Sequence, residues 1–519
     1  MGLVLNLLSK KKIKDMKKLI ILLTALLVLG SSCKKFLDVN VTNPNSASAV
    51  PVDLVLPAAL NSVTYFYDQP DYTSFAPLWL GWWSVSSGYS QPSNLKQYLL
   101  INSNYQAFWQ LSYETLQNFD YIETNSSDPK MKSFRAISKI MKVYLFQNLV
   151  DLYGNIPYSK ALQANSGVLK PTYDKDQDIY ENLVVQLDTA MNIISTITPD
   201  VTEVGSSDII YQGDMGLWAK FANTIKLRML MNQSGMSGRD SYIQSNLATT
   251  ASVGYIGAGE GAMLNPGYVQ SAGKMNPFWE KFYKQDNSGQ ADALTYYVAG
   301  QDASDFMNAN NDPRATRYFV LTAGGAIAGN YFGASVLSNP TLCSKLGPGM
   351  LQNYNQSAPV LTDVESLFLQ AEAVQRGDMT GDAQALYESA VTQSILYEGQ
   401  KSHWDAANYT PLTSIDAATY LAQVDANVNW GASSDKIMAI ITQKWIGLMG
   451  LAPLTMYTDY RRTGFPNFIH FTQDPLKQGP GTPPVRLLYP QSEISTNNDN
   501  LVLQGTIDLF TSKIFWQNR

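Results

Sequence analysis

The 519-residue sequence contains only two cysteines and two histidines, and each scarcity excludes a class of architecture or chemistry. Two cysteines, Cys33 and Cys343, cannot form a framework of several disulfides, so we expect the fold to depend on a large core. Cys343 is expected to be a buried or loop thiol. His403 and His470 form neither an H-E-x-x-H nor an H-x-H arrangement, so the sequence predicts no metal ion and no cofactor.

Charge is scarce as well, because Asp, Glu, Lys and Arg together make up 15% of the chain. No cluster of Lys and Arg offers the basic surface that nucleic-acid binding requires, so we expect no nucleic-acid partner. Aromatic residues reach 11%, with 30 tyrosines and 10 tryptophans. A surface that relies on amide, hydroxyl and tyrosine side chains is typical of extracellular proteins that handle carbohydrates.

The N-terminus has the layout of a secretory signal peptide. Six lysines precede an apolar run at residues 19–29, which is too short to span a bilayer. Small residues follow at positions 30–32, so we assign residues 1–32 to the signal. Met16 begins a more typical signal, which would make residues 1–15 an upstream extension. Without this leader, 31 basic and 42 acidic residues remain, a net charge near −11.

Cys33 follows the small residues directly, an arrangement that resembles a bacterial lipobox. An acylated Cys33 would be the mature N-terminus, and residues 33–50 would be a tether to the membrane. The lipobox usually has leucine three positions before the cysteine, where this chain has Gly30. The alternative is a soluble secreted protein in which Cys33 has no role.

Residues 51–519 are predicted to form one mainly α-helical domain. Apolar residues at helical spacing, separated by glycine and proline stops, indicate about four helical pairs of the tetratricopeptide-like kind. These pairs cover residues 105–153, 176–232, 363–394 and 415–450. Residues 233–360 are rich in Gly, Asn, Ser and Tyr, so we expect an irregular insertion on the ligand side.

Several motifs distributed along the chain resemble one family. The most specific is residues 443–466, which contains QKW and DYRRTGFP, with a helix expected at 435–450 and a turn after Gly450. Further motifs are CKKFLD at 33–38, DLYGNIPY at 151–158, DPR at 312–314 and RLLYPQSE at 486–493. Together they resemble the SusD/RagB-like outer-membrane nutrient-binding lipoproteins.

This resemblance implies a cell-surface lipoprotein that is not an enzyme. Such a protein would bind oligosaccharides and deliver them to a SusC-type TonB-dependent transporter. The RagB branch implies peptides as an alternative ligand. A surface glycoside hydrolase is a further alternative, but acids such as Asp174, Asp176 and Asp178 are better explained as helix-start residues.

Sugar binding needs exposed aromatic faces with polar groups around them. The candidates are aromatic residues in two irregular stretches: Trp79, Trp82, Trp83, Tyr89, Trp279 and Tyr283. Two adjacent tryptophans cannot both face the core of a helix, so at least one of Trp82 and Trp83 is expected to present an exposed face.

Overall fold

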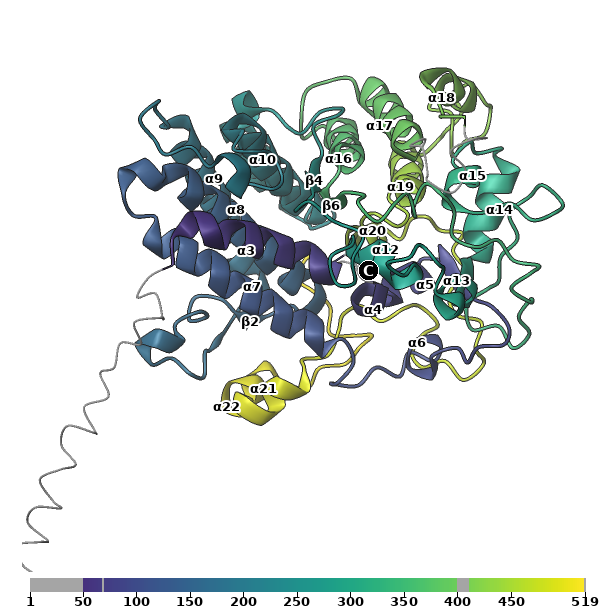
Figure 1. Ribbon diagram of the computed structural model, residues 1–519, viewed down its shortest axis with the longest axis horizontal. Helices are drawn as coiled ribbons and strands as arrows, with labels where there is room; N and C mark the ends of the chain where they lie inside the picture. Colours follow the sequence, from purple (N-terminus) through teal and green to yellow (C-terminus); the bar gives the residue numbers. More distant parts are fainter. Residues whose placement is uncertain (1–49, 68–69, 399–409, 518–519) are drawn as a thin grey trace, which may run out of the picture. The chain divides into compact units, whose positions relative to one another are not determined.

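The computed structural model describes residues 50–67, 70–398 and 410–517, in which helices joined by long loops predominate (Figure 1). Residues Val52–Arg519 form one compact unit. The predicted signal peptide, Cys33, nearly all of the tether and His403 lie outside the described residues. Cys343 is buried, as expected, and its sulfur lies 3.5 Å from Asn330 Nδ2.

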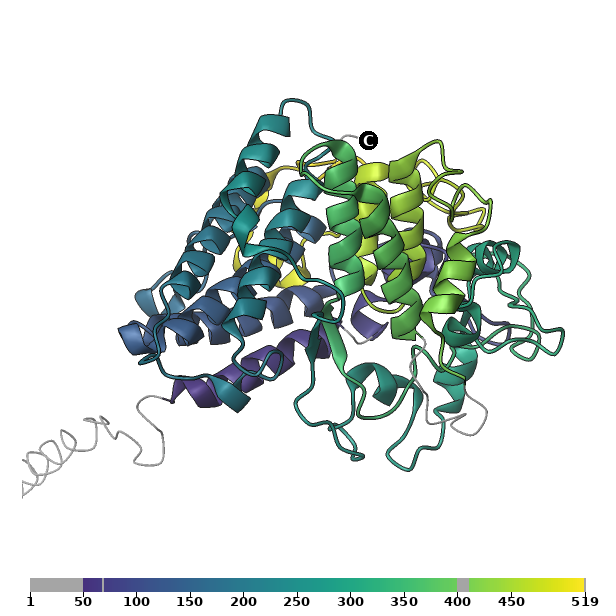
Figure 2. The same ribbon diagram turned by 90° about the horizontal axis from the view of Figure 1, so that it is seen from above.

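The predicted pairs of helices are present. They comprise α7 (Gln106–Asn125) with α8 (Lys132–Tyr153), α9 (Asp176–Ser195) with α10 (Met215–Asn232), α16 (Asp363–Arg376) with α17 (Ala383–Glu398), and α18 (Ser414–Leu421) followed by α19 (Lys436–Gly447). Each of the first three pairs packs as a hairpin, whereas α18 packs against α17 and α19 packs against α16 and α17. Because α8 also contacts α9, and α10 contacts α16, the helices form one continuous row (Figure 2).

Local signals in the sequence set the ends of these helices. The side chain of Asp214 accepts the Leu217 N–H at the start of α10, and Thr362 accepts the Glu365 N–H at the start of α16. Gly377 ends α16 in the left-handed conformation, with φ of 83°, which glycine adopts without steric cost. The expected helices therefore arise from caps and stops in the local sequence as well as from packing between helices.

The first part of the domain and the predicted insertion contain shorter elements. Those before the helical row are α3 (Val52–Tyr67), α4 (Pro70–Thr73), α5 (Phe75–Trp79), β1 (Trp83–Val85) and α6 (Ser93–Lys96). Strands β2 (Ile156–Pro157) and β3 (Tyr173–Asp174) lie between α8 and α9. The insertion holds α11 (Asp240–Thr249), β4 (Ala262–Leu264), α12 (Pro277–Phe282), α13 (Ala291–Tyr296), β5 (Tyr297–Ala299), α14 (Gln301–Ala309), α15 (Ala315–Tyr318) and β6 (Ala358–Leu361). The strands pair antiparallel as β1–β5, β2–β3 and β4–β6, and each pair joins segments that are separate in sequence.

The segment after Gly450 corrects one prediction. It was expected to be a turn, but Pro453–Thr463 forms helix α20. Pro453 occupies the first turn of this helix, where its missing N–H is not needed for a helical hydrogen bond. The chain ends with α21 (Gln491–Thr496) and α22 (Asn498–Leu501).

The most specific sequence motif is an internal structural element. Lys444 Nζ lies 2.8 Å from Asp459 Oδ2, and Arg462 Nη2 lies 2.6 Å from Asp459 Oδ1. Arg462 also forms an ion pair with Glu372 of α16, at 2.5 Å. All four side chains are almost completely buried. The charged residues of the motif therefore join α19 and α20 to α16 inside the protein.

Polar residues of α10 contact partners inside the domain. Lys226 Nζ lies 2.6 Å from Asp188 of α9, and Arg228 Nε lies 2.6 Å from Glu365 of α16. Asn223 donates hydrogen bonds to the carbonyl oxygens of Thr250 and Gly254. These contacts satisfy buried polar groups and fix the spacing between neighbouring helices.

The pKa values of two buried acids, Asp151 and Glu372, are shifted in opposite directions. Burial raises the pKa of Asp151 to about 6, although Tyr180 and Trp516 donate hydrogen bonds to its carboxylate. Burial also acts to raise the pKa of Glu372, but the positive charges of Arg462, Arg376 and Lys444 together outweigh it and lower that pKa to about 2. Stability from Glu372 is therefore lost as pH falls below about 4.5, whereas stability from Asp151 is lost as pH rises.

We expect Asp151 to make the free energy of unfolding fall between about pH 4 and pH 6. Native Asp151 keeps its proton up to about pH 6, whereas an unfolded carboxyl releases it near 3.9, a difference on the order of 3 kcal/mol. Asp151→Asn retains an oxygen acceptor and should remove this part of the slope. Urea unfolding at several pH values measures it, and an unchanged slope in the variant would contradict the assignment.

Candidate functional site

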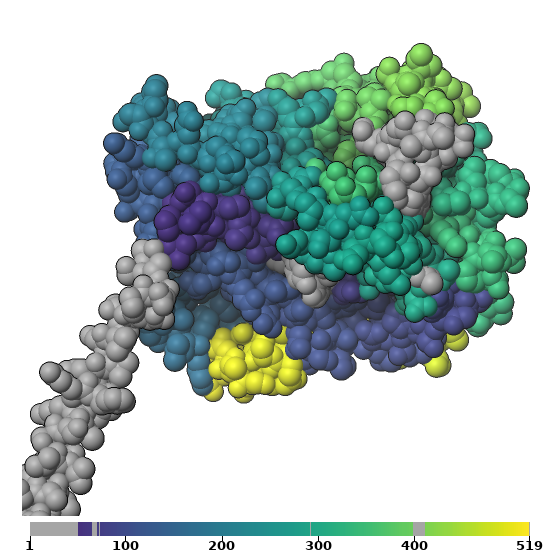
Figure 3. All heavy atoms as spheres, viewed as in Figure 1, coloured from purple at the N-terminus to yellow at the C-terminus, as the bar shows by residue number. Residues whose placement is uncertain are grey.

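Two adjoining hollows open beside α12, in the region predicted to carry the ligand side. The first, the loop hollow, has a volume of about 590 Å³, and the second, the tyrosine hollow, has about 830 Å³. Both are lined by Asp71, Glu280 and Lys281, so they share a boundary. In the space-filling view of Figure 3, the teal residues of the insertion lie near the middle of the visible face.

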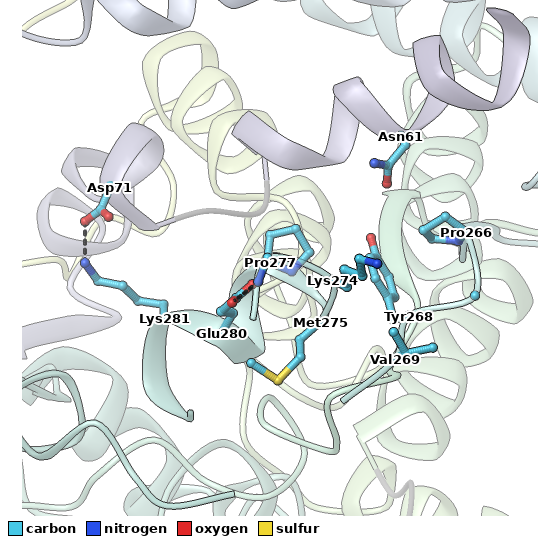
Figure 4. Close-up of a pocket in the computed structure, with 12 residues that line it drawn as sticks. Asn61, Asp71, Pro266, Tyr268, Val269, Lys274, Met275, Pro277, Glu280 and Lys281 are labelled. Atoms are coloured by element: carbon cyan, nitrogen blue, oxygen red, sulfur yellow. Dashed lines mark hydrogen bonds and ion pairs between the residues drawn. The ribbon is translucent and has the colours of Figure 1, made fainter. Parts of the chain in front are cut away.

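An ion pair forms the boundary between the hollows. Lys281 Nζ of α12 lies 2.6 Å from Asp71 Oδ1 of α4, and both side chains are partly exposed. Figure 4 shows Lys281 extended toward Asp71. This pair links the first irregular stretch of the chain to the insertion, which lies about two hundred residues later.

The loop hollow is shaped by hydrogen bonds within the insertion. Glu280 accepts the Gly273 N–H at 2.6 Å, and Asn265 accepts the backbone N–H groups of Gly267 and Tyr268. Tyr268 lies beside Asn61 of α3 at the other end of the hollow (Figure 4). The partly exposed ring of Tyr268 on the loop and the amide of Asn61 on α3 therefore line the same space.

The tyrosine hollow is lined by two rings from distant segments. Tyr89 and Tyr296 pack edge to face with their centroids 5.5 Å apart, and both remain partly exposed. The Tyr89 hydroxyl forms a hydrogen bond with Thr295 Oγ1 and lies 3.5 Å from Asp292 Oδ1. These contacts hold the Tyr89 ring at the rim of the hollow.

The β1–β5 pairing brings these two segments together. Trp83 pairs with Ala299 and Val85 pairs with Tyr297, and the Ser86 N–H donates to the Tyr296 carbonyl at 3.1 Å. Tyr297 packs against Trp83 with centroids 5.5 Å apart, and against Tyr296 at 4.8 Å. Buried aromatic rings therefore support the exposed ring of Tyr296 from behind.

Among the six predicted contact residues, only Tyr89 lines the loop hollow or the tyrosine hollow, and Trp83 lines a smaller cavity of about 40 Å³ next to Phe278 of α12. Trp79, Trp82, Trp83 and Trp279 have at most 2% of their surface exposed, and Tyr283 has 7%. The expectation of an exposed face on Trp82 or Trp83 is therefore wrong. It assumed one continuous helix, but the chain turns at Gly81 and enters β1, and neighbouring elements cover both tryptophans. Ligand contact by any of the six stays a prediction.

The residues that sequence reasoning missed have little local signal. The hollows contain Asn61, Asp71, Tyr268, Glu280, Lys281 and Tyr296, which come from three separate segments. The adjacent pair Tyr296 and Tyr297 was one usable clue, because Tyr296 ends α13 and Tyr297 begins β5, where side chains start to alternate in direction along the extended chain. One tyrosine of such a pair is thus placed to face solvent when the other is buried.

The acids proposed as possible glycosidase carboxylates have structural partners. Asp174 accepts hydrogen bonds from the backbone N–H groups of Tyr158 and Ser159, and Asp176 accepts the Phe515 N–H at 2.9 Å. Within the described residues, no group of three or more His, Cys, Asp or Glu side chains is placed to hold a metal ion. None of the helices in that part of the chain has the length and hydropathy needed to cross a membrane.

Solved structures with the same fold cover nearly the whole chain. A chitin-binding protein aligns with a TM-score of 0.73 and 24% identity, covering 90% of this chain and 99% of its own. A SusD/RagB family protein from Bacteroides thetaiotaomicron aligns with a TM-score of 0.73 and 19% identity, covering 91% and 100%. A chitin-binding SusD homologue from Flavobacterium johnsoniae aligns with a TM-score of 0.72 and 21% identity, covering 89% and 98%.

No curated protein matches the chain. The sequence motifs, the helical row and the solved structures all indicate the same group of proteins. Residues 44–490 match the SusD-like family, which is described as starch-binding and associating with the outer membrane, and the chain belongs to that family.

Proposed function

We propose that this protein captures oligosaccharides at the outer membrane and passes them to a SusC-type TonB-dependent transporter. The observation that carries the proposal is the pair of joined hollows, where partly exposed Tyr89, Tyr268 and Tyr296 lie among amide and charged side chains. Flat rings can cover the apolar C–H faces of a sugar, while amides and carboxylates can bond its hydroxyl groups. Ligand capture requires no reacting group, so we propose a binding role without catalysis.

The membrane attachment in this proposal rests on the sequence around Cys33. An acylated Cys33 would hold the domain at the membrane through residues 33–50, with residues 51–519 as the binding domain. Labelling of cells with a radioactive fatty acid tests this step. Label that persists in Cys33→Ser would contradict it.

Calorimetric titration of residues 34–519 with an oligosaccharide panel tests the binding site. The panel should contain malto-, cello- and chito-oligosaccharides, since the family is described as starch-binding and two solved relatives as chitin-binding. We expect Tyr296→Ala to weaken binding about tenfold to thirtyfold, because truncating a central aromatic contact typically costs about 2 kcal/mol.

Tyr242→Ala is the matched control for this substitution. Tyr242 is a partly exposed tyrosine on α11 that lines neither hollow. If Tyr296→Ala and Tyr242→Ala bound the oligosaccharide with equal affinity, the placement of the site beside α12 would be contradicted. Thermal unfolding of each variant separates a loss of ligand contact from a loss of fold.

A peptide ligand is the second candidate, and the charges of the hollows favour testing it. Asp71, Glu280 and Asp292 lie with Lys274, Lys281 and Lys284 along the two hollows, so both signs of charge are present. A peptide with charged termini should bind more weakly as salt is increased, whereas a neutral glycan should not. Binding of peptides alone, with this salt dependence, would replace the glycan proposal.

A further inference from the structure

A third hollow lies in the helical row, apart from the site beside α12. It has a volume of about 400 Å³ and is formed by α7, α8, α9 and the loop after β2. We call it the scaffold hollow. It shares no lining residue with the loop hollow or the tyrosine hollow. Its volume lies within the range of about 300–1,000 Å³ that is usual for small-molecule sites.

Four alternating charges line one side of the scaffold hollow. Lys142 Nζ lies 2.6 Å from Asp120 and 3.1 Å from Glu123, and Lys139 Nζ lies 2.7 Å from the other oxygen of Glu123. Burial acts to raise the pKa of Glu123, but the two lysines outweigh it and the pKa is lowered. The charges are therefore paired and sum to zero, so this side has no net attraction for an ion.

Hydrogen bonds also orient the two amide side chains of α9 that line the hollow. The Tyr158 hydroxyl donates to Asn182 Oδ1 at 2.6 Å, and Lys139 donates to Gln186 Oε1 at 2.7 Å. Gln186 Nε2 in turn lies 3.4 Å from Asn182 Oδ1, so the two amides also contact each other and each is held in one orientation. The row of polar groups is therefore ordered before any ligand arrives.

An aromatic wall completes the scaffold hollow. The partly exposed ring of Tyr158 packs edge to face on buried Phe146, with centroids 4.8 Å apart. Buried Val143 and Leu183 also line the hollow. A flat apolar face thus stands beside paired charges and oriented amides.

We infer that the scaffold hollow is a second binding site for a neutral sugar. An uncharged polyol can bond the amides and the outer sides of the ion pairs while its C–H face covers Tyr158. An ion gains nothing from a wall of zero net charge, and a fully apolar ligand would displace water from the ion pairs and amides without replacing its hydrogen bonds. This site does not depend on the two hollows beside α12, since different elements build it.

Filling the hollow with a bulky side chain tests the inference. Gln186→Trp, on the partly exposed side of α9, should occupy the space and weaken sugar binding at this site at least tenfold. Val185→Trp is the matched control, because Val185 is the preceding residue on α9, is 55% exposed and does not line the hollow. The probes are maltotriose, cellotriose, triacetylchitotriose and glycylglycine, followed by calorimetry and by crystal soaks at tens of millimolar.

We expect one trisaccharide to occupy the scaffold hollow, with an affinity that is unchanged between low and high NaCl. This binding should persist in Tyr296→Ala and in Val185→Trp but not in Gln186→Trp. If the site beside α12 binds no sugar, Gln186→Trp should abolish all binding, so the two proposals fail separately. Binding in Gln186→Trp with the same number of sites as in the unsubstituted protein, an empty hollow in the soaked crystals, or binding of glycylglycine alone would overturn the inference.

Discussion

Replacing Arg462 with methionine should lower the free energy of unfolding by about 3–5 kcal/mol, the usual cost of removing one partner from a buried ion pair. The Arg462 guanidinium donates two hydrogen bonds to the Glu372 carboxylate, at 2.6 and 2.5 Å, and one to Asp459 at 2.7 Å. Without it, Glu372 would remain buried with less compensating charge. Urea unfolding followed by tryptophan fluorescence measures the change.

Arg376→Met is the matched control for this prediction. Arg376 forms an ion pair with the same carboxylate at 2.9 Å, but its side chain is 25% exposed. Because solvent screens that pair, its loss should cost no more than about 1 kcal/mol. If Arg462→Met were no more destabilising than Arg376→Met, the motif would not have the structural role assigned to it.

The second large effect is expected from Gly300→Ala, at the end of β5. Gly300 has an ordinary φ of −72°, so alanine is acceptable to the backbone itself. The added Cβ, however, would collide with the carbonyl oxygen of Gly81 and lie 2.9 Å from the carbonyl carbon of Trp82. Overpacking of this kind typically costs about 1–3 kcal/mol, and backbone atoms cannot move aside as a side chain can.

The same substitution should also weaken ligand binding. Relief of the collision requires β5 to move away from the turn before β1, and β5 directly follows Tyr296 in the tyrosine hollow. Gly324→Ala is the control, since its Cβ would meet only Thr322 Oγ1 at 3.8 Å. Urea unfolding and the oligosaccharide titration should both separate the two variants. Equal results for both would mean that the close approach of β1 and β5 does not shape the site.

Much of the helical architecture could be predicted because its causes are local. Spacing of apolar residues, Asp and Thr caps and the glycine stop at Gly377 lie within a few residues of the helices they define. Helix α20 was missed because Pro453 and the dense polar residues after it were interpreted as a turn. Its polar side chains lie inside the protein, where Asp459 and Arg462 meet partners from other helices.

The site was predicted only in outline. The sequence indicated that aromatic residues in two irregular stretches would contact the ligand, and Tyr89 was one of these candidates. It could not indicate which aromatic rings are exposed, because exposure depends on covering elements that are distant in sequence. Trp83 is covered by Tyr297 and Phe278, which lie about two hundred residues away along the chain.

The sequence by itself determined the family and the mainly helical scaffold, since the motifs and helical patterns that indicate them lie in contiguous residues; the N-terminal signal stays a prediction. Only the tertiary structure decided where a ligand could be held. The β1–β5 pairing and the Asp71–Lys281 ion pair bring Tyr89, Tyr296 and α12 into one place. Such contacts are selected by the packing of the whole domain, and no short stretch of sequence specifies them.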